Sequence, residues 1–208
     1  MAAALLASPT LAAAGEIGRN ADPRPLEEKA QAAEKKGEVL EEKSSAGGDK
    51  KAPAAAQTIT KPEAQAVDPR GEEALDDALT CLARSIYWEA KGEDRPGMEA
   101  IASVVMNRLG NGSFPNTVCG VVKEGKESGA CQFSWWCDGR PDDVEEESRY
   151  TIAMEISRQA LNRQLPDRTG GALYFHAAKV APGWDNDYVK TAEIGHHRFY
   201  KPKEGKAK

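Results

Sequence analysis

The stretch DDALTCLARSIYWEA, residues 76–90, decides the fold. The two aspartates that open it suit the positive end of a helix dipole, and Gly92 can end the helix. We therefore expect an amphipathic helix from about residue 76 to residue 90 with one side buried. The apolar residues that define this side recur at helical spacing and are Leu79, Leu82, Ala83 and Ile86.

Glu89 falls on the buried side of this expected helix, three residues after Ile86 and seven after Leu82. A carboxyl group held among apolar groups has a raised pKa, because its charged form loses hydration. A general acid that works near neutral pH needs such a pKa, and glycoside cleavage needs a proton donor beside the glycosidic oxygen. The alternative is a solvated charge in the last turn of a helix, which periodicity alone favours.

Three more helices are expected downstream. Pro96 suits the first turn of one helix, whose apolar residues repeat at helical spacing until Gly110. The segment TVCGVVKEG, residues 117–125, is typical of a short helix with a polar cap. A long helix from about residue 143 to residue 163 has an acidic start and a regular apolar side.

The remaining aromatic segments predict irregular structure and short strands. Residues 131–141, CQFSWWCDGRP, are expected to form a loop or a short hairpin. Residues 172–201 are β-prone with Gly and Pro breaks, so short strands or loops should pack on the helices. All aromatic residues and cysteines lie beyond residue 76. The sequence thus predicts one catalytic domain over residues 76–202, of the α+β class and predominantly helical.

The segments outside this domain have a different composition. Residues 15–75 contain no aromatic residue or cysteine, so little large apolar surface offsets the entropy of ordering, and we expect a disordered linker. Residues 1–14 end in three alanines, as a signal peptide would, but lack Lys and Arg; the alternative is an Ala-rich terminus. Residues 203–208 form a basic tail.

The cysteines indicate disulfide bonds. An even number of cysteines behind an expected export signal favours two disulfides, in any of three pairings. The last two bracket QFSWW and could close a short loop, which would leave the first two as the other pair. Zinc is the alternative, but the chain has no Cys-x-x-Cys pair, and its histidines are not at ligand spacing, so no metal is expected. The four candidates are Cys81, Cys119, Cys131 and Cys137.

The charge and hydropathy patterns argue against two classes of partner. The formal charge of −5 is spread over both signs, without a basic stripe interleaved with aromatic residues, so no nucleic acid is expected. No run approaches the roughly 18 apolar residues that span a bilayer, so no stable membrane span is expected. No cofactor is expected either.

Motifs in order from Leu82 to Tyr200 resemble the SleB-type cell-wall hydrolases, the family of spore-cortex-lytic enzymes and their relatives. The motifs are LARSIYWEAKGE, PGMEAIASVVMNRL, FPNTVCGVV, CQFSWWCDG, and TGGALYFH with IGHHRFY. The resemblance implies a lysozyme-like fold. Together with the expected export signal and disulfides, it predicts a periplasmic or secreted enzyme. Its implied partner is the peptidoglycan glycan strand, which the family cleaves at the β-1,4 bond between N-acetylmuramic acid and N-acetylglucosamine.

The resemblance places the catalytic acid of the family on Glu89. Similar lytic transglycosylases use one Glu, which protonates the leaving oxygen and then activates the muramic 6-hydroxyl, so that a 1,6-anhydro product forms. A hydrolytic muramidase is the alternative, with Asp138 as the candidate second acid. A peptidoglycan-binding protein without turnover is another alternative, although it would not need the acid. A metal-dependent amidase would need a set of ligands that the three histidines do not supply.

Further positions match motifs of the family. Gln132 and Ser134 resemble the segment across from the acid and are expected to bind the sugar; the alternative is that they hold their own loop. Tyr174 is expected to orient Glu89 or the substrate, with core packing as the alternative. Of the tryptophans Trp135, Trp136 and Trp184, we expect one, Trp135, to stack on a sugar ring.

Other positions are expected to be structural or depart from the family. Asn107 and Arg108 match the family, and we favour a structural bond for them. His176 and His197 also match it, without metal-ligand spacing. Three positions differ from the residues common in relatives: Met98, Lys91 and Trp88. Of these, Met98 and Trp88 bear on the shape near the substrate.

Overall fold

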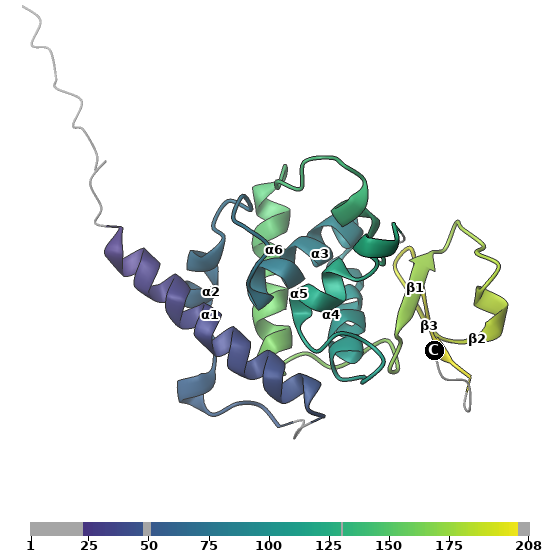
Figure 1. The fold of residues 1–208 in the computed structure, drawn as a ribbon, viewed down its shortest axis with the longest axis horizontal. Coiled ribbons are helices and arrows are strands. Elements are labelled where there is room, and N and C mark those ends of the chain that lie inside the picture. The colour runs from purple at the N-terminus through teal and green to yellow at the C-terminus, as the bar shows by residue number, and fades with distance from the viewer. Residues whose placement is uncertain (1–22, 48–50, 130, 204–208) are drawn as a thin grey trace, which may run out of the picture.

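The structure, a computed structural model, describes residues 23–47, 51–129 and 131–203. A group of helices forms the core, and a three-stranded sheet lies at one end of the molecule, opposite α1 (Figure 1). The helices and strands are α1 (Arg24–Ser45), α2 (Lys61–Val67), α3 (Ala78–Ala90), α4 (Arg95–Leu109), α5 (Val118–Lys123), α6 (Glu147–Leu161), β1 (Tyr174–Ala177), β2 (Tyr188–Ile194) and β3 (His197–Pro202). Short 3-10 helices are η1 (Ala55–Gln57), η2 (Lys126–Ser128), η3 (Ser134–Cys137) and η4 (Asp185–Asp187). The predicted α+β, predominantly helical class is confirmed.

Helices α3 and α4 form as the apolar spacing predicted. The Asp77 carboxylate caps α3 by accepting hydrogen bonds from the backbone N–H groups of Leu79 and Thr80, at 2.8 and 3.0 Å. The Asp94 carboxylate caps α4 by accepting from the N–H of Gly97 at 3.1 Å. Helix α3 is buried along nearly its whole length, so it is the central helix of the core.

Helix α6 begins at residue 147, later than the predicted residue 143, because the preceding backbone bonds elsewhere. The N–H groups of Glu145 and Glu146 donate to the Tyr87 hydroxyl at 3.0 and 2.9 Å, and the Val144 N–H donates to the Gly71 carbonyl at 3.1 Å. These bonds hold residues 144–146 against α3 and the segment before it in place of the first helical turn. The short helix α5 lies within the predicted range.

The sheet is antiparallel, with β3 between β1 and β2. Phe175 pairs with Phe199, and the Phe175 ring lies 6.3 Å from that of Phe133, so this face of the sheet packs on the core. Tyr174 pairs with Tyr200 on the opposite face. The predicted short strands in residues 172–201 are confirmed.

The prediction of a disordered linker over residues 15–75 is wrong for α1 and α2. Helix α1 buries a stripe of mostly small residues, Ala33, Gly37 and Leu40. A Cβ at Gly37 would lie 3.7 Å from the Cβ of Ala78, so the backbones of α1 and α3 approach closely here. Close packing of small side chains therefore supplies the burial that the composition seemed to lack.

Polar contacts also join this N-terminal segment to the core. The Lys36 ammonium lies 2.8 Å from the Glu63 carboxylate and links α1 to α2. The Ile59 N–H donates to Asn162 Oδ1 at 2.9 Å, and Asn162 Nδ2 donates to the Ile59 carbonyl at 2.8 Å. Both backbone groups of Ile59 are thus satisfied by the residue that follows α6.

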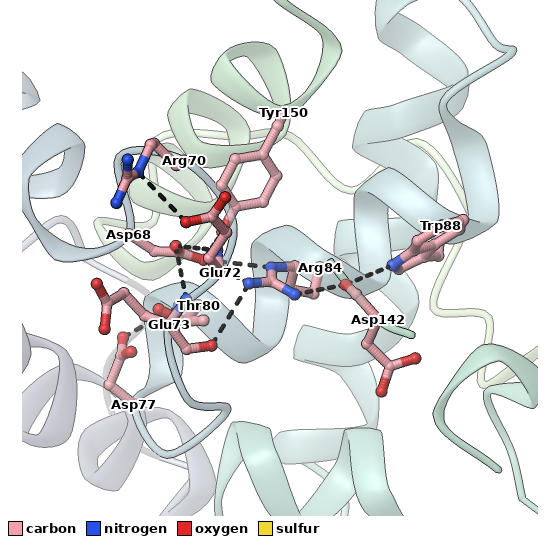
Figure 2. A network of polar contacts seen from close by, with 10 residues as sticks. All are labelled: Asp68, Arg70, Glu72, Glu73, Asp77, Thr80, Arg84, Trp88, Asp142 and Tyr150. Carbon is pink, nitrogen blue, oxygen red and sulfur yellow. Dashed lines mark hydrogen bonds and ion pairs between the residues drawn. The ribbon is translucent and has the colours of Figure 1, made fainter. Parts of the chain in front are cut away.

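A buried network extends this connection to α3 (Figure 2). Asp68 accepts hydrogen bonds from the Arg84 guanidinium at 3.1 and 3.2 Å and from the Tyr150 hydroxyl. Arg84 also donates to the Asp142 carbonyl, which accepts from the Trp88 indole at 3.2 Å. The folded unit therefore begins well before residue 76, and the predicted domain boundary there is wrong.

Some predictions fall on residues outside the described ranges. These are the signal peptide over residues 1–14, the first part of the linker (15–22), and residues 204–208 of the basic tail. Within the described ranges, no helix combines the length and apolar character that a bilayer crossing requires.

Candidate active site

Glu89 lies in the last turn of α3, and its side chain is half-buried. Burial raises the pKa of its carboxyl from an ordinary 4.5 to about 7, while the positive charge of Arg108 acts in the opposite direction. Among the described residues, no hydrogen bond contributes to this shift. Such a carboxyl occurs in both protonation states near neutral pH, so it can both donate and accept a proton.

Arg108 comes from the last turn of α4 and is 2% exposed. Its Nε donates to the Leu173 carbonyl at 2.7 Å, which is the structural bond that the sequence predicted. Its burial lowers the pKa of the guanidinium to about 10. Three aromatic rings surround the guanidinium carbon at 5.3, 5.4 and 5.7 Å from their centroids, and they belong to Phe114, Phe133 and Tyr174.

Asn107 also has a structural bond, as predicted. Its Nδ2 donates to the Ala172 carbonyl at 3.1 Å and to the Asp167 carboxylate at 3.2 Å. Together, Asn107 and Arg108 join the end of α4 to the segment that leads into β1. This connection positions the first strand beside the helices.

Tyr174 and Glu124 complete an electrostatic cluster around Arg108. Burial is the main cause that raises the pKa of the Tyr174 hydroxyl, and the neighbouring Tyr188 raises it further. Glu124 directly follows α5, and the charges of Glu124, Tyr174 and Glu89 all favour the protonated guanidinium of Arg108. Four elements thus meet here, and the predicted role of Tyr174 stays a prediction. Sequence reasoning missed Glu124, whose relation to Arg108 arises only from the packing of α4 against α5.

The loop after η2 alternates between exposed and buried side chains. Gln132 and Ser134 are exposed, whereas Phe133 is fully buried. The Gln132 N–H donates to the Glu124 carbonyl at 3.1 Å, which places this loop beside the cluster. The substrate-binding roles of Gln132 and Ser134 stay predictions, and their exposure is compatible with them.

Trp135 does not fit the predicted stacking role. It is only 6% exposed and belongs to the hydrophobic core. Trp136 and Trp184 are half-buried. Trp184 lies over the outer face of the sheet, where its ring is 5.4 Å from that of Tyr188. The sequence signal, a pair of adjacent tryptophans, did not reveal which ring turns inward.

Both disulfides that the spacing suggested are present. Cys81 and Cys119 join α3 to α5, with their Cα atoms 5.3 Å apart. Cys131 and Cys137 close the loop that carries Gln132 and Ser134, with a Cα separation of 6.2 Å. The first bond therefore ties the helix of the candidate acid to α5, and the second closes the loop on itself.

Asp138, the candidate second acid, lies elsewhere. Its carboxylate accepts a hydrogen bond from the Arg140 N–H at 2.9 Å. The pKa of Asp142 is raised mainly by burial, and the charge of Asp138 is the second cause. It does not contribute to the pKa of Glu89. The structure thus groups Asp138 with Asp142 and not with the candidate acid.

The histidines belong to structural contacts of the sheet. Glu93, in the turn between α3 and α4, is buried, and its carboxylate accepts from the His196 N–H at 2.8 Å. His197 Nδ1 lies 3.2 Å from the same oxygen, and His176 Nε2 lies 3.0 Å from the Tyr200 hydroxyl. The contacts of Glu93 hold the β2–β3 turn against the turn between α3 and α4. Among the described residues, no group of three His, Cys, Asp or Glu side chains could hold a metal ion.

The positions that depart from the family have structural partners. The Trp88 indole donates to the Asp142 carbonyl at 3.2 Å (Figure 2), and Lys91 Nζ lies 2.9 Å from the Glu145 carboxylate. Lys91 Nζ also lies 4.5 Å from the centroid of the Trp88 ring. Met98 is fully buried. Trp88 and Lys91 therefore help to hold the segment before α6 against α3.

Comparison with known proteins identifies the family. The model described as Cell Wall Hydrolase matches residues 92–200, more than half of the chain. The chain belongs to the cell wall hydrolase family. Glu89 lies just before the residues matched by this model. The curated relatives below agree with the resemblance to SleB-type enzymes.

Among curated relatives, this cell wall hydrolase is 33% identical over 138 residues to the spore cortex-lytic enzyme of Oceanobacillus iheyensis, covering 64% of the chain and 44% of the relative. It is 32% identical over 125 residues to that of Halalkalibacterium halodurans, covering 60% of the chain and 34% of the relative. The chain thus spans less than half the length of these relatives.

Two solved catalytic domains are also similar to this cell wall hydrolase. The first is that of the Bacillus cereus SleB protein, which is 31% identical, with 60% of this chain and 89% of that chain covered and a TM-score of 0.48. The second is that of the germination-specific lytic transglycosylase SleB from Bacillus anthracis. It is 31% identical, with 60% and 93% covered and a TM-score of 0.49.

Proposed function

We propose that this protein cleaves peptidoglycan glycan strands at the β-1,4 bond between N-acetylmuramic acid and N-acetylglucosamine, with Glu89 as its catalytic acid. Membership of the cell wall hydrolase family supports the substrate class. The observation that carries the proposal is the half-buried Glu89 carboxyl with a pKa raised to about 7. An ordinary solvated glutamate would be almost fully ionised at that pH and could not act as the proton donor.

The first step uses Glu89 as the acid. Its carboxyl proton passes to the glycosidic oxygen that leaves with N-acetylglucosamine, and the bond from that oxygen to C1 of the muramic residue breaks. Positive charge then develops at C1, while Glu89 remains as a carboxylate. The exposed Gln132 and Ser134 are proposed to bind the sugar, and the half-buried Tyr174 to orient the substrate or Glu89.

The second step distinguishes a transglycosylase from a hydrolase. In the transglycosylase reaction, which we favour, the muramic 6-hydroxyl attacks C1 and gives its proton to the Glu89 carboxylate. A 1,6-anhydro sugar forms, and Glu89 returns to its protonated state without the use of water. A single carboxyl near pKa 7 suits both roles.

Hydrolysis by water is the alternative, and the position of Glu124 supports it. This half-buried carboxylate acts on Arg108, as Glu89 does, so a second acidic group lies in the same cluster. Asp138 is less suited, because it is exposed and does not influence Glu89. Binding without turnover is the remaining alternative.

The two disulfides support action outside the cytoplasm, in the periplasm or after secretion. Peptidoglycan lies in that compartment, so the proposed location and the proposed substrate agree.

Digestion of purified sacculi tests this function. The protein should release soluble muropeptides, and Glu89→Gln should abolish the release while the unfolding transition remains. The control is Glu42→Gln on the exposed side of α1, which should digest at the parent rate. Equal digestion by Glu89→Gln and the parent would contradict the assignment of the acid. Product masses decide the second step, because an anhydro product weighs one water less than a reducing sugar.

A further inference from the structure

Aromatic side chains gather on the outer face of the sheet, opposite the face that packs on the core. Tyr174 pairs with Tyr200 across β1 and β3, and alternation along β1 places His176 on the same face. The His176 and Tyr200 rings are stacked, with their centroids 5.1 Å apart. The outer aromatic cluster consists of Tyr174, His176, Trp184, Tyr188 and Tyr200.

Trp184 is the centre of this cluster. It directly precedes η4 in the connection between β1 and β2, at the end of the molecule away from the helices (Figure 1). Its ring makes T-shaped contacts, a preferred geometry, with three rings whose centroids lie 5.4–5.5 Å away, those of His176, Tyr188 and Tyr200. Trp184 and Tyr188 are nevertheless only half-buried. The cluster is therefore a preformed aromatic surface that still faces solvent in part.

Trp184 differs from the other tryptophans in what covers its ring. Trp135 is buried in the core. A lysine ammonium lies over the Trp88 ring at 4.5 Å from the centroid, and another lies over the Trp136 ring at 4.7 Å. Among the described residues, no Lys or Arg lies over the Trp184 ring. The exposed part of this ring is thus open to a ligand.

Tyr174 connects the cluster to the candidate active site. Its ring centroid lies 4.8 Å from that of Tyr188 on one side and 5.7 Å from the guanidinium carbon of Arg108 on the other. The same guanidinium carbon lies 5.4 Å from the ring of Phe133. Phe133 belongs to the loop that carries the proposed sugar-binding residues. The outer aromatic cluster is therefore continuous with that loop through direct contacts.

The chemistry of the cluster matches a sugar. The flat apolar faces of aromatic rings pack against the C–H groups of a pyranose ring, and the hydroxyl and N–H groups at their edges can bond to its hydroxyls. A glycan strand also extends beyond the bond that is cleaved, so its remote sugars can supply binding energy. A surface that continues from the candidate site and presents such rings suits this polymer.

We propose that Trp184 and Tyr188, with Tyr174 at the end nearer Arg108, form a subsite that binds a sugar of the glycan strand away from the cleaved bond. This inference rests on the proposed function, because the glycan strand is the substrate named there. It assigns the stacking role predicted for Trp135 to the open ring of Trp184. Loss of the subsite should weaken binding of the strand and leave the proton transfer of Glu89 in place.

NMR of the indole N–H groups tests this subsite without any measurement of activity. The intact Glu89→Gln protein, labelled with ¹⁵N-tryptophan, keeps the glycan uncleaved, and Trp184→Phe assigns the signal. Glycan strands stripped of their peptide stems should shift the Trp184 signal saturably, while the signal of the buried Trp135 moves little. A Trp184 signal that stays unmoved up to the solubility limit of the glycan would overturn the proposal.

Tyr188 supplies matched variants for a binding measurement. In the Glu89→Gln protein, Tyr188→Ala should weaken binding of the same glycan about 3- to 10-fold, because a stacking ring is lost. Tyr188→Phe keeps the ring and should bind nearly as well as the Glu89→Gln protein. The control is Val189→Ala, an exposed neighbour on the opposite face of β2. A folded Tyr188→Ala protein that binds as tightly as this control would contradict the subsite.

Two further arms separate other occupants and the proposed function. A Trp184 shift with free stem peptides and not with stripped glycan, or with protein concentration alone, would assign this face to a peptide or a second copy and overturn the proposal. Sacculus digestion by the parent tests the function separately. A glycan-induced shift without digestion would reject cleavage and keep the subsite, whereas digestion with an unmoved Trp184 signal would reject only the subsite.

Discussion

Asp68 and Arg84 form an ion pair that is almost wholly buried, with Arg84 Nη2 3.1 Å from Asp68 Oδ2 (Figure 2). The pair joins a residue just after α2 to the middle of α3, five positions before Glu89. The Asp68 carboxylate also accepts from the backbone N–H of Glu72 at 2.9 Å. The helix of the candidate acid is therefore held in place by a segment that the composition alone assigned to a linker.

Asp68→Asn is expected to destabilise the protein by about 3–5 kcal/mol, because it leaves the Arg84 charge buried without its counter-ion. Urea unfolding measures this loss. The control is Asp76→Asn, an exposed position nearby, which should change the free energy of unfolding by less than about 0.5 kcal/mol. Equal stability of the two variants would show that the N-terminal segment contributes little to the fold.

Gly37 gives a second test of the contact between α1 and the core. Gly37→Ala should stabilise the protein by up to about 1 kcal/mol, since alanine favours the helix and a Cβ at 3.7 Å from the Ala78 Cβ is an ordinary contact. Gly37→Leu should destabilise it by about 1–3 kcal/mol, because the larger side chain would force α1 away from α3.

The control for this pair is Glu38→Leu, at an exposed position of the same helix. The melting temperatures of the variants should therefore decrease in the order Gly37→Ala, parent, Gly37→Leu. The melting temperature of Glu38→Leu should lie close to that of the parent. A Gly37→Leu protein as stable as the parent would mean that α1 does not pack closely on the core in solution.

These residues also show what the sequence could and could not predict. Helices α3 and α4 were predictable because large apolar side chains recur at helical spacing. Helix α1 was not, because its buried stripe is mainly alanine and glycine, and its stabilisation comes from backbone proximity that composition does not reveal. The late start of α6 depends on the Tyr87 hydroxyl, a tertiary partner that no local pattern identifies.

The residues of the candidate site also differ in whether the sequence could predict them. Glu89 could be singled out because helical register places it on the buried side of a strongly periodic segment. Glu124 could not, since its relation to Arg108 depends on how α5 packs against α4. Trp135 was expected to stack on a sugar ring, whereas it is buried in the loop closed by Cys131 and Cys137.

The raised pKa of Glu89 also makes stability depend on pH with a definite sign. The carboxyl has a pKa of about 7 in the folded protein, against about 4.5 when unfolded. Between these values the folded state binds more protons than the unfolded state, so the free energy of unfolding falls as pH rises. Glu89→Gln removes this contribution. The variant should therefore gain stability relative to the parent between about pH 4.5 and pH 7, and keep the gain at higher pH.

The expected gain at pH 8 is about 1–3 kcal/mol, since the full shift corresponds to about 3 kcal/mol and the side chain is only half-buried. Urea unfolding of both proteins at pH 4 and pH 8 measures it, with Glu42→Gln as the control that should follow the parent at both values. In the same pH range, kcat/KM of the parent on soluble glycan fragments should decline above about pH 7 as the acid ionises. A stability difference between Glu89→Gln and the parent that stays constant from pH 4 to pH 8 would place the pKa of this carboxyl at its ordinary value, and Glu89 could not then serve as the proton donor at neutral pH.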